Sequence, residues 1–193
     1  MMLKQFYLVF IVMVSQLLIA CSQVAIEDYE NTAPLITIEE LFDGDLVAYG
    51  IVRDRSGKVL RHFEAVLKGD FDANGGTLDE VFWFNDKARE TRLWRMEKID
   101  SGRYVGTAGD VEGEAVIESR GNAVRLNYDL RIPYKNSDIV VAMDDWMYQV
   151  APGIIVNEAT MHKWGFKVGT VTVLIMRADA MQQVPALIER FDQ

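Results

Sequence analysis

The sequence predicts an all-β protein, an antiparallel meander of about ten strands that closes into a barrel. From Asp45 onward, short runs rich in Val, Ile, Tyr, Phe, Trp and Thr are separated by clusters of Gly, Asn, Asp, Ser and Pro, as in strands joined by tight turns. The clusters recur about every dozen residues, and no long stretch between them has helical periodicity. Successive strands that close on themselves leave no exposed edge, which favours the barrel over the alternative, a β-sandwich.

Such a barrel is lipocalin-like, because about eight to ten strands enclose an interior that is filled by side chains or holds one small ligand. The clearest strand covers 122–132, where Val124, Leu126 and Tyr128 alternate with Arg125 and Asn127, so that one face is apolar and the other polar. The expected strands are 45–54, 59–69, 78–84, 90–98, 103–108, 112–119, 122–132, 138–149, 153–161 and 168–177.

Short helices are expected on both sides of the strands. Thr37 and Glu40 have the spacing of a capping box before the apolar pair Leu41-Phe42, which predicts a helix over 37–42. The tail 179–191 has helical character that Pro185 interrupts, and its apolar side would cover one end of the sheet.

The N-terminus has the features of an export signal. Residues 1–20 carry one cation, Lys4, no acid, and an apolar run of fifteen residues from Phe6 to Ala20. The run is shorter than the ~20 residues of a membrane-spanning helix and suits the core of a signal peptide. It ends in Leu18-Ile19-Ala20-Cys21, which resembles a bacterial lipobox, and Cys21 is the only cysteine. We therefore expect cleavage before Cys21 and a diacylglycerol on its thiol.

The chain is accordingly divided into a lipoprotein signal peptide, 1–20, a lipidated cysteine with a tether, 21–34, and a single barrel-like domain, 35–193. By resemblance to lipoprotein sorting in Gram-negative bacteria, Ser22 after the cysteine implies the periplasmic face of the outer membrane. Residues 22–34 would reach at most ~45 Å when extended, which keeps the domain close to the lipid surface.

Composition excludes several classes of protein. The 193 residues suffice for one domain with a sizeable core. Twenty Lys and Arg against 29 Asp and Glu give a net charge of −9, which argues against nucleic acid as a partner, since phosphate contacts need a basic surface. One cysteine excludes an intramolecular disulfide framework and a Cys-rich zinc site.

Motifs for cofactors and metals are lacking, so we expect neither. The sequence has no nucleophile elbow, no phosphate-binding P-loop and no dinucleotide-binding glycine loop. Residues 70–75 begin like a calcium loop, but its closing acid would fall at Val81. We interpret this segment as a hairpin turn in which Asn74 and Gly75 supply positive φ. His62 and His162 stand 100 residues apart, without the spacing of metal ligands.

Paired acids interrupt an apolar run over 139–148. Asp144 and Asp145 are adjacent, so one should point into the barrel and the other outward, and the alternation does not decide which. An inward carboxylate needs a partner or a proton, and the arginines that also interrupt apolar patterns are Arg55, Arg61 and Arg92. The pair would then be a structural ion pair, a polar anchor for a ligand head group, or a general acid and base.

A second acidic segment is Asp110-Val111-Glu112-Gly113-Glu114. Strand alternation would place its three acids on one side, where they would need water, arginines or a cation. Aromatic residues, Trp94 among them, either fill the core or line a cavity of lipid size. The candidate set for ligand binding or structural pairing is Arg55, Arg61, Arg92, Trp94, Asp110, Glu114, Asp144, Asp145 and Trp146.

Several segments together resemble an uncharacterised family of bacterial lipoproteins of this size, a domain of unknown function with an Asp-Asp-Trp-Met motif. The segments that carry the resemblance, between Tyr29 and Arg177, are 42–44, 50–58, 75–80, 92–94, 108–115 and 144–148. The resemblance implies export and lipidation, and it supplies no catalytic residues.

Three functions are consistent with these observations. The first is a lipid-anchored envelope protein that binds a lipid or another hydrophobic small molecule in its barrel. The second is a structural or interaction module of an envelope assembly, with a solid core. The third is a lipid-modifying enzyme that uses Asp144 or Asp145. We favour binding over catalysis, because no nucleophile or metal motif accompanies the acids.

Overall fold

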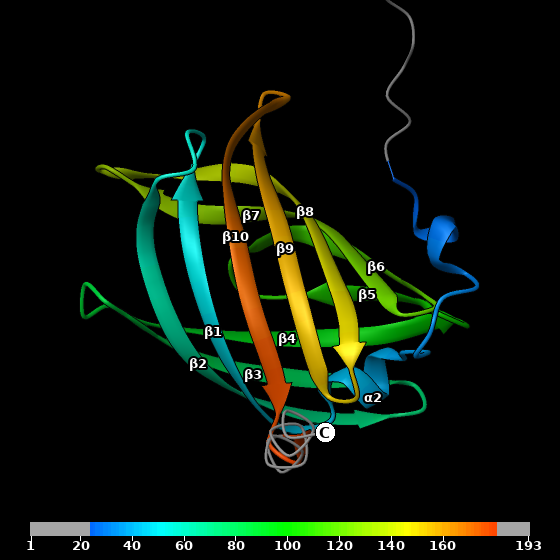
Figure 1. Cartoon of the computed structure of the whole chain (residues 1–193). Helices are drawn as coiled ribbons and strands as arrows, with labels where there is room; N and C mark the ends of the chain where they lie inside the picture. The colour runs from blue at the N-terminus through cyan, green and yellow to red at the C-terminus, as the bar shows by residue number, and fades with distance from the viewer. Residues whose placement is uncertain (1–23, 181–193) are drawn as a thin grey trace, which may run out of the picture.

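Ten antiparallel strands follow one another around a closed barrel in the computed structural model, which describes residues 24–180 (Figure 1). Each strand pairs with its neighbours in sequence, and β10 pairs with β1 to close the ring. The strands are β1 (Gly44–Asp54), β2 (Val59–Asp72), β3 (Gly75–Phe84), β4 (Arg89–Asp100), β5 (Arg103–Thr107), β6 (Val111–Arg120), β7 (Ala123–Tyr134), β8 (Ser137–Ala151), β9 (Ile154–Lys163) and β10 (Phe166–Arg177).

The closed ring confirms the predicted lipocalin-like barrel of ten strands and decides against the sandwich. Most observed strands are one to three residues longer at an end than predicted. The largest difference is at the hairpin between β2 and β3, where the turn consists of Ala73 and Asn74 alone. Only Gly75, with φ of 131°, has a positive φ there, so the expectation of a positive φ at Asn74 was wrong.

Alternation along the strands separates an apolar interior from a polar exterior. On β7, Val124, Leu126 and Tyr128 are buried, whereas Arg125 and Asn127 face outward and are half-buried. The same period holds on β2, as expected for a barrel with one buried face per strand.

One end of the barrel is closed by the short helix α2 (Ile38–Phe42), at the lower right in Figure 1. The Thr37 hydroxyl accepts a hydrogen bond from the Glu40 backbone N–H at 3.2 Å, which confirms the predicted cap. Ile38, Leu41 and Phe42 are buried against the strands. The opposite end carries the turns β1–β2, β3–β4, β5–β6, β7–β8 and β9–β10, and these form an open rim.

The 3-10 helix η1 (Ile26–Tyr29) packs on the outside of the barrel. Ile26 is 2% exposed and lies against Ala123 and Trp146. The Thr32 hydroxyl donates a hydrogen bond to the Asn122 side-chain oxygen at 2.6 Å. The segment expected as a free tether is therefore docked from Ile26 to Thr32, because its apolar side chains cover the outer face of β7 and β8.

Several predicted features lie outside the described residues. These are the signal peptide 1–20, Cys21, Ser22 and residues 181–191 of the expected C-terminal helix. Within residues 24–180, no helix has the length and apolarity to cross a membrane.

Candidate functional site

The barrel encloses a continuous cavity of about 1080 Å³. Phe42 of α2 lines its closed end, and Asp54, Asp86 and Tyr134 line it near the rim turns. Its walls are mostly apolar and come from strands all around the ring, with side chains that include Phe63, Leu78, Phe82, Met96, Leu126 and Met143. A cavity of this size matches the pockets that hold small organic ligands.

A group of polar side chains interrupts this apolar wall. We call it the interior polar cluster; its members, contributed by five strands and the β5–β6 turn, are Glu80, Arg92, Trp94, Asp110, Tyr128, Asp145 and Asn157. Four of them belong to charged residue types, and all line the cavity. Polar groups in such a place are costly unless they pair with one another or with a ligand.

Arg92 on β4 is bound to Asp110 in a forked geometry. The Arg92 Nε donates to both Asp110 carboxylate oxygens at 3.0 Å, and Nη2 donates to Oδ2 at 2.7 Å. Bidentate pairs of this kind are strong and directional. Asp110 therefore occupies two of the three guanidinium nitrogens.

Glu80 on β3 is 8% exposed and less well satisfied. Its Oε2 is buried and has no hydrogen-bond partner among the described residues, and Arg92 Nη1 is 3.8 Å away. Burial raises the pKa of Glu80 to about 7. Arg92 and a hydrogen bond from the Trp94 side chain oppose this rise, and Asp110 and Asp145 reinforce it. The carboxyl group is consequently divided between its neutral and charged forms near neutral pH.

Asp145 on β8 is the inward member of the acidic pair and is 6% exposed. It accepts hydrogen bonds from Asn157 Nδ2 and, at 3.3 Å, from the Tyr128 hydroxyl. Burial raises the pKa of Asp145 to about 6, and these two hydrogen bonds oppose the rise. The Trp94 ring packs edge-on against the Tyr128 ring, with 5.4 Å between centroids, which fixes the phenol beside the carboxyl group.

Asp144 and Trp146 lie on the other face of β8, outside the cavity. Asp144 Oδ1 accepts a hydrogen bond from Arg125 Nε at 2.7 Å, and the Arg125 guanidinium carbon is 4.9 Å from the Trp146 ring centre. The η1 segment covers Trp146. These two members of the candidate set thus belong to an exterior cluster, because alternation turns the neighbours of an inward residue outward.

The remaining candidates are dispersed. Arg55 is exposed in the β1–β2 turn, and Glu114 is exposed on β6. Arg61 lies at the rim, where it pairs with Asp86 at 2.8 Å and Glu90 at 3.1 Å. It also covers the Phe84 ring at 3.5 Å from the centroid. Of the arginines proposed as partners for an inward carboxylate, only Arg92 lies in the interior polar cluster.

The three acids of 110–114 do not share one side, contrary to the prediction. Asp110 precedes β6 and reaches Arg92, whereas Glu112 and Glu114 are exposed. Gly113 has φ of 72°, and the pairing of β6 with β7 shifts register between Glu112 and Val116. This bulge breaks the period of two on which the prediction depended.

Sequence reasoning missed Glu80, Tyr128 and Asn157 as site residues. The signal was available for two of them, since Glu80 alternates in phase with Leu78 and Phe82, and Asn157 with Ile155 and Ala159. A polar residue at an apolar phase of a strand marks an inward position.

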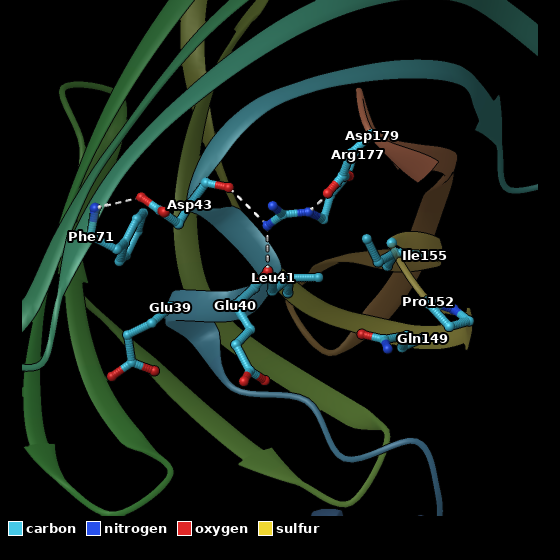
Figure 2. Close-up of a pocket in the computed structure, with 11 residues that line it drawn as sticks. Glu39, Glu40, Leu41, Asp43, Phe71, Gln149, Pro152, Ile155, Arg177 and Asp179 are labelled. Carbon is cyan, nitrogen blue, oxygen red and sulfur yellow. Dashed lines mark hydrogen bonds and ion pairs between the residues drawn. The ribbon is translucent and has the colours of Figure 1, made fainter. Parts of the chain in front are cut away.

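A second, smaller pocket of about 510 Å³ lies at the closed end, between α2, the β8–β9 turn and the end of β10 (Figure 2). Arg177 Nη1 donates to the backbone carbonyls of Glu40 at 2.7 Å and Asp43 at 2.8 Å. These bonds attach the end of β10 to the helix that closes the barrel, so Arg177 has a structural role. Within residues 24–180, no three His, Cys, Asp or Glu side chains are grouped to hold a metal ion.

A closed barrel of ten strands around an apolar cavity defines a lipocalin-like β-barrel protein. The chain belongs to the family described as "Protein of unknown function (DUF3833)", which matches residues 15–177. This agrees with the expected membership in an uncharacterised family. No curated protein matches the chain in sequence.

Solved structures share the fold, two of them with a TM-score of 0.52. A protein of unknown function from the DUF3598 family of Nostoc punctiforme has a TM-score of 0.52 and 13% identity, over 76% of this chain and 51% of its own. The chain thus spans about half the length of the Nostoc protein. The S-type phycobiliprotein lyase CPES from Guillardia theta has a TM-score of 0.52 and 7% identity, over 79% of this chain and 96% of its own. At these identities the likeness shows the fold alone.

Proposed function

We propose that this protein is a lipid-anchored envelope lipoprotein whose barrel binds one amphiphilic small molecule. The observation that carries the proposal is the continuous cavity of about 1080 Å³, apolar in its walls and polar at one cluster. An apolar body would lie against the walls while a polar head meets the interior polar cluster. The lipocalin-like neighbours are consistent with such a use of the fold.

The free energy of binding would come from both the apolar chain and the polar head of such a molecule. Burial of a CH2 group contributes about 0.8 kcal/mol, so a chain of about ten such groups gains roughly 8 kcal/mol before losses. Association costs about 4 kcal/mol or more in lost freedom. Burial of the apolar chain alone therefore gives only modest affinity. Tighter binding requires additional free energy from contacts of the head group.

The lipid anchor is proposed at Cys21, on the lipobox that precedes it. Because η1 packs on the barrel from Ile26, the chain from Cys21 to Ile26 could span at most ~17 Å. This reach is shorter than the ~45 Å predicted from the sequence for residues 22–34. Radiolabelled palmitate should label the full-length protein in cells and fail to label Cys21→Ser; equal labelling of both would contradict the anchor.

The binding proposal is tested with phenylnaphthylamine, a neutral fluorophore that brightens in apolar surroundings. The full-length protein with Cys21→Ser should bind one molecule per chain. Ala159→Trp, at a buried position that lines the cavity, should fill the space and abolish binding. Ala142→Trp, at an exposed position on β8, is the matched control and should bind normally. Absence of binding by the parent protein, or equal binding by Ala159→Trp when circular dichroism shows a folded barrel, would refute the proposal.

A further inference from the structure

Carboxyl groups outnumber cations in the interior polar cluster. Glu80, Asp110 and Asp145 contribute three carboxyl groups, and Arg92 contributes the one guanidinium. Asp110 takes the Nε and Nη2 donors of that guanidinium. The third nitrogen, Nη1, is 3.8 Å from Glu80, so the single cation of the cluster already faces two carboxyl groups.

Acceptor capacity, in contrast, is left over. Asp145 has donors in Asn157 and Tyr128, but Glu80 Oε2 receives no hydrogen bond from any described residue. Glu80 is 8% exposed and lines the cavity. A buried acceptor without a partner is rare in native proteins and indicates a missing donor.

We propose that Glu80 receives the head group of the ligand, and that the cavity selects amphiphiles whose head donates hydrogen bonds, such as an amine, amide or alcohol, over carboxylates. This inference deepens the proposed function and rests on it. A donating head completes the hydrogen bonding of Glu80 Oε2. An amine head also balances the excess negative charge of the cluster.

A carboxylate head group is disfavoured in this cluster. It brings a fourth carboxyl group next to Glu80 and Asp145, in surroundings where like charges repel strongly. Arg92 is already held by Asp110, whose Oδ2 is 2.7 Å from Nη2, and its remaining nitrogen Nη1 faces Glu80 Oε2 at 3.8 Å, so an added carboxylate would compete with two carboxyl groups for one cation. A buried hydrogen bond gained in one case and a charge left unpaired in the other correspond to roughly tenfold or more in affinity.

The test compares four chains of equal length with different heads: dodecylamine, dodecanamide, dodecanol and dodecanoate. Each displaces phenylnaphthylamine from the full-length Cys21→Ser protein at neutral pH, with the amine and dodecanoate kept below their micelle concentrations and the amide and alcohol below their solubility limits. The amine, amide and alcohol should displace the fluorophore at concentrations at least about tenfold lower than dodecanoate. Glu80→Gln, which keeps the size of the side chain and removes its charge, should lose most of the preference for the amine. Glu64→Gln, at an exposed acid on the outer face of β2 that does not line the cavity, is the control and should keep the ranking.

The outcomes separate the two proposals. If dodecanoate binds as well as the amine, or if Glu80→Gln leaves the ranking unchanged, the head-group assignment is wrong while the binding function stands. If neither the fluorophore nor any chain binds, the proposed function itself fails. The ranking in the parent protein tests the assignment even if Glu80→Gln does not fold.

Discussion

Asp144 and Asp145 are neighbours in sequence, yet their surroundings have little in common. Asp144 is half-buried on the outer face, paired with Arg125, whereas Asp145 is buried in the cavity, where its hydrogen-bond donors are neutral. Alternation predicts that the two diverge, but only the closed barrel decides which one is inside. Glu80 adds a second buried acid nearby, and desolvation raises the pKa of both carboxyl groups.

This burial predicts an unusual dependence of stability on pH. Because the pKa of Glu80 is raised from 4.5 to about 7, the folded protein holds this proton more tightly than the unfolded chain. The contribution of this bound proton to the free energy of unfolding is full below about pH 4.5 and is lost as the pH rises toward 7. The free energy of unfolding, measured with urea, should fall between about pH 5 and about pH 8 in the parent protein. In Glu80→Gln this fall should be smaller by on the order of 1–3 kcal/mol.

Glu64→Gln, at an exposed acid outside the cavity, is the matched control and should follow the parent curve. An unchanged pH slope in Glu80→Gln would mean that Glu80 is charged and solvated in the folded protein, contrary to its burial.

At the scale of elements, the strands are largely predictable from the sequence, since a period of two and turn residues are local signals. The bulge in β6 could not be predicted, because Gly113 breaks the alternation without a local marker that separates it from other glycines. The docking of η1 was also missed, because the surface that covers Ile26 comes from Ala123 and Trp146, far along the chain. The cap at Thr37 was predicted because its spacing to Glu40 is local.

The closure of the barrel by α2 depends on Gly69 of β2. A Cβ atom there would lie 1.7 Å from the Phe42 backbone oxygen, at the end of the helix. Gly69→Ala should therefore push α2 away from the barrel end and lower the free energy of unfolding by about 1–3 kcal/mol, measured by urea denaturation. Gly109→Ala, where the added Cβ meets nothing within 4 Å, should have little effect. Equal stability of the two variants would show that α2 does not press on β2.

At the scale of the whole molecule, closure brings together residues that no local pattern connects. The interior polar cluster draws Glu80 from β3, Arg92 from β4, Asp145 from β8 and Asn157 from β9, so its composition depends on closure of the barrel rather than on any one segment.

The position of η1 relative to the open rim is also defined by the fold. Tyr29 of η1 lies against Gly121, and Thr32, just after η1, bonds Asn122, in the turn between β6 and β7, at the end of the barrel opposite the rim. An anchor at Cys21 would thus hold the closed end of the barrel near its membrane.

Native mass spectrometry of the full-length Cys21→Ser protein shows whether the barrel interior is a binding site. We expect a non-covalent complex of one protein with one amphiphile, either carried through purification or formed on addition of dodecylamine, and its loss in Ala159→Trp. A bare protein that takes up none of the four twelve-carbon chains would contradict it.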